Sequence, residues 1–125
     1  MRNKYGNRKI VTADGEFDSR HEYQRWCQLK LLQRAGEITF LMRQKKFLLI
    51  PSQYEKYERI SEKTGKRLKD GCRCVEKECS YVADFVYYRS NGELVVEDAK
   101  GVRTEGYIIK RKLMLQVYGI KISEV

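Results

Sequence analysis

Two strand-like segments on either side of a turn constrain the fold more than any other feature of this sequence. The segments 81–88 and 94–100 are rich in β-branched and aromatic residues, and Ser90-Asn91-Gly92 lies between them. Such runs around an Asn-Gly turn signal predict an antiparallel β-hairpin. The sequence therefore places a hairpin at the centre of the fold, and its strands carry charged residues where a core would favour apolar ones.

The length of the turn decides whether two aspartates of this hairpin meet. Asp98 and Lys100 are two residues apart and therefore point to the same face of the sheet. A two-residue turn would place Asp84 opposite Ala99, on the wrong face. A three-residue turn with Gly92 in the left-handed conformation would place Asp84 directly opposite Asp98. A site built from both aspartates requires the three-residue turn or a bulge.

If the two aspartates meet, their chemistry favours a divalent cation. Two carboxylates directly across a strand pair repel each other unless a cation joins them, and oxygen ligands favour Mg²⁺ or Mn²⁺. Such a metal polarises a phosphoryl oxygen, and Lys100 would orient water or neutralise charge in the transition state. Glu97 points to the other face and is excluded on that ground. The alternative is an exposed sheet face on which Lys100 pairs with an aspartate.

The charge of the chain favours a polyanionic partner. Its 125 residues carry 26 Lys and Arg against 17 Asp and Glu, a formal net charge of +9. Basic proteins gain affinity for nucleic acid by neutralising phosphates and releasing counterions, although a soluble protein can also simply be basic. No apolar run approaches the length of a membrane span, and the first residues lack the apolar stretch of a signal peptide. We therefore expect no membrane partner and a cytoplasmic location.

Two helices and several short strands are expected around the central hairpin. Ser19 opens a helix that runs to about Ala35, and a second helix spans about Thr104 to Tyr118. The apolar face of the first helix comprises Tyr23, Trp26, Cys27, Leu29, Leu31, Leu32 and Ala35. That of the second comprises Ile108, Ile109, Leu113, Met114 and Val117. Short strands are expected at 38–41, 47–50 and 120–122. This order predicts a single domain, 1–125, of α+β or mixed α/β class, with helices packed on a sheet.

Two segments stand apart from this core. The N-terminal residues 1–16 form an arm that ends in a small hairpin turning at Ala13-Asp14-Gly15. The segment 52–80 is charged and weakly periodic, and we interpret it as an insertion in the domain rather than a linker. Its three cysteines, Cys72, Cys74 and Cys79, resemble a zinc knuckle that lacks an obvious fourth ligand. A mobile loop with free thiols is the favoured alternative.

A third carboxylate is available at the start of the first helix. Ser19-Arg20-His21-Glu22 has the form of a capping box, in which Glu22 would bond the backbone N–H of Ser19. Glu22 also precedes Trp26 and Leu29 by four and seven residues, at the end of the face that packs on the sheet. From there its carboxylate can reach a metal held by the hairpin. His21 lies one position off this face and is expected at the surface.

These residues together resemble a known group of enzymes. Glu22 on a leading helix, then Asp84, then Asp98-Ala99-Lys100 resemble the PD-(D/E)XK nuclease superfamily over about 17–122. Ala83 stands where the superfamily name has proline, and Asp98 where glutamate is commoner. More narrowly, the segments 4–7, 17–22, 81–85 and 96–101 resemble a family of small phage-encoded endonucleases akin to Holliday-junction resolvases.

The resemblance implies both a fold and an activity. The fold would be a restriction-endonuclease-like core of helix, mixed sheet with a central hairpin, helix and final strand. Glu22, Asp84 and Asp98 would be catalytic, metal-binding carboxylates, Ala99 a further metal contact and Lys100 the catalytic lysine. The implied cofactor is Mg²⁺ or Mn²⁺, and the implied activity is endonucleolytic cleavage of DNA. We expect branched or junction DNA in phage replication or recombination, in the host cytoplasm, and a homodimer remains open.

Basic residues near the hairpin and at the N-terminus are candidates for holding DNA. They are Arg103, Lys110, Arg111, Lys4, Arg8 and Lys9. For each group the alternative is a solvated charged face. The rival function is a non-catalytic nucleic-acid-binding protein on the same fold, with the cysteine cluster holding zinc.

Overall fold

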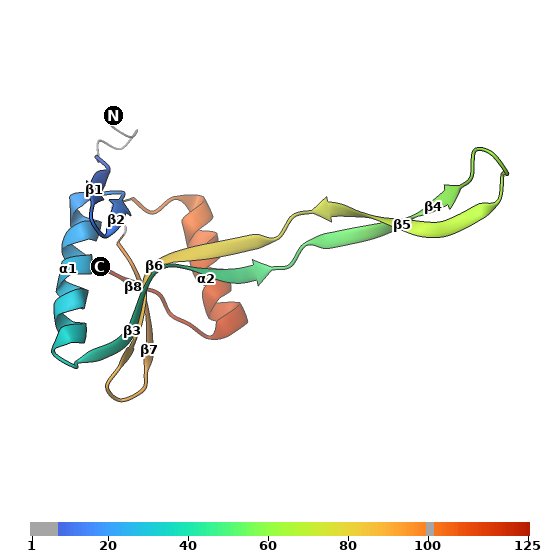
Figure 1. The fold of residues 1–125 in the computed structure, drawn as a ribbon. Helices are drawn as coiled ribbons and strands as arrows, with labels where there is room; N and C mark the ends of the chain where they lie inside the picture. The colour runs from blue at the N-terminus through green and yellow to red at the C-terminus, as the bar shows by residue number, and fades with distance from the viewer. Residues whose placement is uncertain (1–7, 100–101) are drawn as a thin grey trace.

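A four-stranded mixed sheet forms the body of the protein. The computed structural model describes residues 8–99 and 102–125. β3 (Ile38–Ile50), β6 (Cys79–Arg89), β7 (Leu94–Asp98) and β8 (Ser123–Glu124) lie side by side in that order. The first three are antiparallel neighbours, and β8 runs parallel to β7. α1 (Arg20–Arg34) covers one face of this sheet and α2 (Glu105–Tyr118) the other (Figure 1). This is the α+β fold that the sequence predicts.

The turn between β6 and β7 has the three-residue form. The N–H of Arg89 donates to the carbonyl of Glu93 at 2.8 Å, and Gly92 has a φ of 86°. A residue with a side chain is strained in that conformation, which explains a glycine here. Phe85 consequently pairs with Glu97, and the same register sets Asp84 opposite Asp98. The register condition for the two aspartates is met.

Both helices begin at the expected caps. The hydroxyls of Ser19 and Thr104 accept from backbone N–H groups three residues on, at 3.1 Å in each helix, and Gly119 ends α2 with a φ of 68°. The expected apolar faces are only partly correct, because each helix covers a narrow strip of sheet. The residues wrongly expected in the core are Leu31, Leu32, Ala35, Ile109 and Val117, all of which are exposed. Tyr107, in contrast, is buried.

β3 is one long strand, so the expectation of two short strands at 38–41 and 47–50 is wrong. The strand continues through the residues between these two segments by way of irregular positions. Phe40 and Gln44 both have a φ of 53°, and the pairing with β6 shifts register between Thr39 and Met42. These are the properties of bulges, which bend a strand without ending it. Polar residues in the middle of β3 therefore lie within the sheet.

The final strand lies later than expected. We expected residues 120–122, whereas β8 comprises Ser123–Glu124. The N–H of Ile120 bonds the carbonyl of Met114 at 3.3 Å, and that of Gly119 bonds Leu115 at 3.0 Å, so these residues still close the helix end. Ile122 is buried in the core. The chain can pair with β7 only after these contacts.

Two cores lie on opposite faces of the sheet. The core under α2 includes Tyr81, Ala83, Val86 and Val96, and the core under α1 includes Phe85, Tyr87 and Val95. Ala83 and Val86 face the same core although they are three residues apart, so the alternation of β6 is interrupted between them. Asp84 lies at this interruption, across from the positive-φ residue Gln44. The sheet is therefore irregular where the acidic residues lie.

A second, two-stranded sheet projects from the body. β4 (Gln53–Ile60) pairs with β5 (Arg67–Glu76), and the two extend away from the end of β3 and β6 (Figure 1). The insertion is thus a β-ribbon, and the expectation of a mobile loop is wrong. A small hairpin of β1 (Ile10–Thr12) and β2 (Gly15–Phe17) precedes α1. Within the described ranges no helix is long and apolar enough to cross a membrane.

Candidate active site

Asp84 and Asp98 come from neighbouring strands and are each held by a hydrogen bond. The backbone N–H of Ala99 donates to Asp84 Oδ2 at 2.8 Å. The hydroxyl of Tyr81 donates to Asp98 Oδ2 at 2.5 Å, and Asp98 is only 2% exposed. Burial raises the pKa of Tyr81, and the bond to Asp98 and the charges of Asp98 and Asp84 raise it further. The phenol therefore remains a donor toward the carboxylate.

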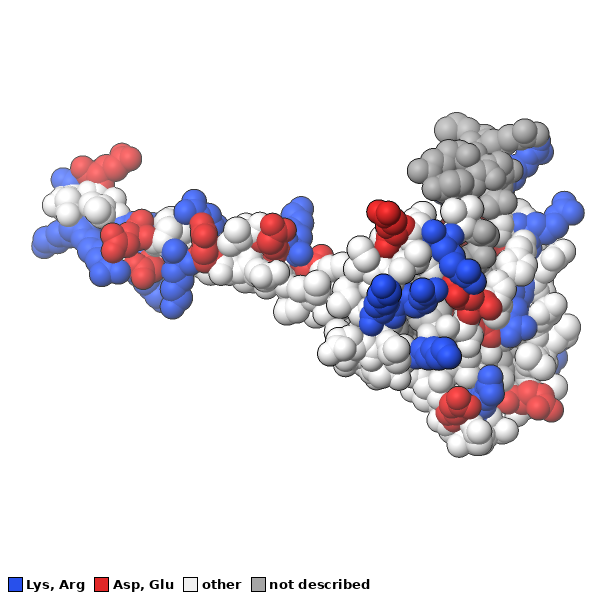
Figure 2. Space-filling model, turned by 180° about the vertical axis from the view of Figure 1, so that it is seen from behind, with Lys and Arg blue, Asp and Glu red and all other residues white. Residues whose placement is uncertain are grey.

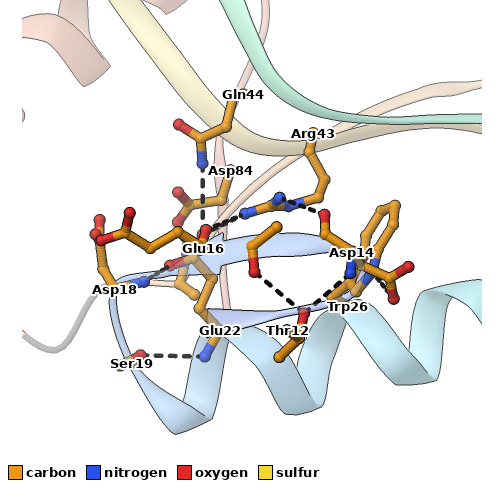
Figure 3. Close-up of polar contacts among 12 residues, drawn as sticks. Thr12, Asp14, Glu16, Asp18, Ser19, Glu22, Trp26, Arg43, Gln44 and Asp84 are labelled. Carbon is orange, nitrogen blue, oxygen red and sulfur yellow. Dashed lines mark hydrogen bonds and ion pairs between the residues drawn. The ribbon is translucent and has the colours of Figure 1, made fainter. Parts of the chain in front are cut away.

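Glu22 approaches from the first turn of α1 and is 3% exposed. Its Oε2 accepts from the backbone N–H of Asp18 at 2.9 Å, and its Oε1 accepts from Gln44 Nε2 at 3.4 Å (Figure 3). Only half of the expected capping box forms, because the carboxylate bonds Asp18 rather than Ser19. The side chain of Asp84 is directed toward the same group of residues (Figure 3). Helix, β3 and β6 thus meet around these carboxylates.

The electrostatics of this region favour a cation. Burial raises the pKa of Glu22, the Asp18 N–H opposes that rise, and the charges of Asp18 and Asp98 add to it. Arg43 lowers the pKa but lies 3.9 Å from Glu22 Oε1, at the limit of an ion pair. The charges of two other carboxylates thus act on the buried Glu22, and a divalent ion would relieve this repulsion.

A hollow of about 250 Å³ opens beside Glu22. Its lining residues are Lys9, Glu16, Asp18, Glu22, Arg43 and Gln44. Carboxylate oxygens are the ligands that Mg²⁺ and Mn²⁺ prefer, so the donors of Glu22, Asp84 and Asp98 suit such an ion. Among the described residues no three His, Cys, Asp or Glu side chains converge closely enough to hold a metal as they stand. The types of donor atom therefore suit such an ion, and the side chains would have to move closer together to hold it.

Glu97 lies on the face opposite to Asp98, as its position in the strand predicts. Arg25 Nε and Nη2 donate to its two oxygens at 2.8 and 2.6 Å, and Tyr87 also donates to it. Burial, with help from Glu97, raises the pKa of Tyr87 to about 12. Glu97 therefore fastens α1 to β7, immediately before Asp98.

Comparison with known proteins identifies a family without an assigned activity. A family described as "Protein of unknown function (DUF1064)" matches residues 2–123. The chain belongs to this family. No curated protein and no solved structure matches it. The DUF1064 match spans the carboxylates of the body and the projecting ribbon alike, so both are parts of one family domain.

The basic candidates of this DUF1064 chain lie in different surroundings. Arg103 and Arg111 both bind Glu124 of β8, at 2.8 and 3.4 Å, and thereby tie α2 to the sheet. Lys110 lines a hollow of about 350 Å³ beside Tyr81 and Tyr107. Lys9 pairs with Glu16 at 3.3 Å beside the Glu22 hollow. Arg8 is exposed, and Lys4 and Lys100 lie outside the described residues.

The three candidate zinc ligands are free thiols on two different strands. Cys72 and Cys74 are exposed on β5, where they pair with Lys56 and Tyr54, whereas Cys79 begins β6. The thiol of Cys74 donates to the carbonyl of Glu76 at 3.2 Å. His21, as expected, is exposed, and its Nε2 contacts the carbonyl of Val125 at 2.8 Å.

Several residues around the carboxylates were not anticipated from the sequence. Tyr81 holds Asp98, Asp18 and Gln44 hold Glu22, and Arg43 packs over the ring of Phe17 at 3.7 Å. A signal for Arg43 and Gln44 was present, because four polar residues, 43–46, interrupt an otherwise apolar stretch. Tyr81 gave none, since an aromatic residue at a strand position is ordinarily a core residue.

Proposed function

We propose that the protein is a divalent-metal-dependent DNA endonuclease that hydrolyses phosphodiester bonds. The observation that carries this proposal is the placement of three carboxylates, Glu22, Asp84 and Asp98, where α1, β6 and β7 meet. Asp84 lies opposite Asp98 in the register of the hairpin, and the charge of Asp98 raises the pKa of Glu22. The net charge of +9 supports a polyanionic substrate.

The metal would be held by the oxygens of Glu22, Asp84 and Asp98, with a backbone oxygen of Ala99 as the further contact. When bound, Mg²⁺ or Mn²⁺ would polarise a phosphoryl oxygen and neutralise charge that develops during hydrolysis. The donor set supports this choice, because hard oxygen ligands select such ions over zinc.

The residues of the chain contribute orientation. Tyr81 fixes the carboxylate of Asp98, and the N–H of Ala99 fixes that of Asp84. The N–H of Asp18 and the amide of Gln44 hold the two oxygens of Glu22. Each of these hydrogen bonds restricts the orientation of its carboxylate, and groups oriented in advance are the basis of electrostatic catalysis. Lys100, two residues beyond Asp98, is proposed to orient the attacking water.

The narrower proposal concerns the DNA. The sequence resemblance to small phage-encoded endonucleases akin to Holliday-junction resolvases favours branched DNA, so we propose a four-way junction or flap as the substrate. This step rests on resemblance alone.

The test is a cleavage assay on matched linear, flap and four-way-junction DNA with Mg²⁺, Mn²⁺ or EDTA. Asp84→Asn and Lys100→Gln should lower the cleavage rate by about 10³-fold, since each removes charge at the reacting centre. Glu37→Gln, an exposed carboxylate just beyond α1, is the matched control and should cut normally.

The outcomes separate the proposals. Binding of DNA without metal-dependent cleavage of any substrate would support the non-catalytic alternative and overturn the nuclease. Equal cleavage of all three substrates would overturn only the preference for branched DNA. Asp84→Asn protein that binds but no longer cuts would support the assigned role.

A further inference from the structure

Within the described residues, the ribbon of β4 and β5 pairs with no strand of the body. It forms a sheet of its own, and its apolar side chains stay exposed, including Tyr54 and Ile60 at 63% each. An isolated two-stranded ribbon is at best marginally stable in water. Because the ribbon projects from the body as a separate sheet, we expect that it binds a ligand (Figure 1).

Cross-strand contacts order the proximal part of the ribbon. Arg73 bonds Glu55 at 2.6 Å and stacks on the ring of Tyr57 at 5.0 Å. That ring covers Gly71, where a β-carbon would lie only 2.3 Å from it. Arg73 and Glu55 in this part are thus paired with each other within the ribbon.

The distal part of the ribbon is different. Residues 59–69 contain five Lys or Arg and one carboxylate, Glu62, a net charge of +4. Figure 2 shows Lys and Arg side chains around the far end of the ribbon. Within the described chain, Lys63, Lys66 and Lys69 are exposed and make no ion pair, whereas Arg67 contacts Asp70 at 3.1 Å. We call Lys63, Lys66 and Lys69 the tip lysines.

The tip itself is ordered. The N–H of Ser61 donates to the carbonyl of Lys66 at 2.9 Å, and the N–H of Gly65 donates to that of Ser61 at 2.8 Å. Lys63 and Lys66 therefore lie on a closed turn between the two strands, and Lys69 lies close by on β5.

We propose that this ribbon is a second DNA-binding surface, which holds duplex DNA remote from the carboxylates through the tip lysines. Unpaired lysines on an exposed turn suit phosphates, and the major groove of B-DNA admits a two-stranded β-ribbon. The eight residues of β4 span about 27 Å, comparable with the helical turn of about 34 Å in B-DNA. The choice of DNA among polyanions rests on the proposed function.

The test compares two triple variants with equal loss of charge. Lys63→Gln/Lys66→Gln/Lys69→Gln removes the tip lysines, and Arg34→Gln/Lys112→Gln/Lys121→Gln removes three exposed cations of the body. Affinity for 30-bp and 10-bp duplexes is measured by fluorescence anisotropy in EDTA at several salt concentrations, and circular dichroism verifies the fold of each variant.

The tip variant should bind the 30-bp duplex about tenfold more weakly at 0.1 M salt. Its salt slope, the change of log K with log [salt], should be lower in magnitude by about 2 to 3, which corresponds to about 0.9 for each phosphate that the tip lysines neutralise. The body variant should lose at most about threefold. On the 10-bp duplex, which offers only about one helical turn, the two variants should bind alike.

Equal affinities and slopes for the two variants on the 30-bp duplex would overturn the proposal. So would tip substitutions that change the sedimentation mass but not the salt slope, because the ribbon would then bind a second copy of the chain. Binding in EDTA does not depend on cleavage. A protein that never cuts but shows the tip effect would disprove only the nuclease, and one that cuts without the tip effect would disprove only this surface.

Discussion

Two arginine–glutamate pairs of equal length sit in opposite surroundings. Arg25 and Glu97 lie 2.6 Å apart between α1 and the sheet, and the Glu97 side chain is 2% exposed. Arg73 and Glu55 also lie 2.6 Å apart, on the ribbon, where both side chains are at least half exposed. Water screens the second pair and hardly reaches the carboxylate of the first. Breaking the buried pair of the body is therefore costly, whereas breaking the exposed pair of the ribbon costs little.

The largest effect is expected from removing the arginine of each pair. Arg25→Met leaves the charge of Glu97 buried with only Tyr87 as a donor, which should cost about 3 kcal/mol in the free energy of unfolding. Arg73→Met, the matched change on the ribbon, should cost less than about 1 kcal/mol. Urea denaturation of both variants measures the difference. Equal losses would show that burial does not distinguish the pairs.

The next effect concerns a buried hydroxyl. Tyr81→Phe removes the hydrogen bond to Asp98 and should cost about 2 kcal/mol, because bonds to charged groups are stronger than neutral ones. Tyr54→Phe on the exposed ribbon is the control and should be neutral within about 0.5 kcal/mol. Mg²⁺ titration of both provides a second readout: weaker Mg²⁺ binding only in Tyr81→Phe would support its role in orienting Asp98. Unchanged Mg²⁺ affinity would show that Tyr81 contributes only to the stability of the fold.

A smaller effect should appear in the pH dependence of stability. Because burial raises the pKa of Glu22 in the folded state, the protonated form is favoured there. Its contribution to stability is present below the unfolded pKa and is lost as pH rises through the folded pKa. Without divalent cations, Glu22→Gln should therefore gain stability relative to wild type between about pH 4 and pH 8.

Thermal melts across this pH range test the gain, with the ribbon variant Glu62→Gln as a control that should track wild type. Mg²⁺ should raise the melting temperature of wild type more than that of Glu22→Gln, since a ligand stabilises the state that binds it. If the melting temperatures of Glu22→Gln and wild type changed in parallel with pH, the result would contradict a raised pKa of Glu22 in the folded state.

The smallest global effect is expected within the ribbon. Gly71→Ala forces the ring of Tyr57 to move, because the added β-carbon would lie 2.3 Å from it. Since the ribbon can open locally without the body, hydrogen exchange should accelerate in 53–76 while global unfolding changes by less than about 0.5 kcal/mol. A large global loss would mean that ribbon and body unfold together.

The sequence predicted best where a local signal decides the structure. Gly92 adopts the positive φ that the three-residue turn requires, and Ser19 caps α1 as expected, because each rule involves only neighbouring residues. The facing of Glu97 and Asp98 followed from strand alternation alone. Which residues of two paired strands face each other can therefore be predicted from sequence, since a single turn sets the register of the whole pair.

Prediction failed where distant contacts decide. The ribbon shows no apolar alternation, because neither of its faces packs on a core, so nothing marked its strands. Leu31 is apolar and helical yet 61% exposed, because it lies about half a turn around the helix from the buried Leu29. Gln44 could be placed only once β3 was known to continue through its bulges.

The ribbon also has a consequence for how the family domain can vary. Ile50 and Cys79 are register partners, so the chain leaves the sheet and returns to it at a single point. The residues between Ile50 and Cys79 therefore do not determine the register of β6 and β7 or the position of α1. The length and charge of the ribbon can therefore change among relatives without a change in the positions of Glu22, Asp84 and Asp98.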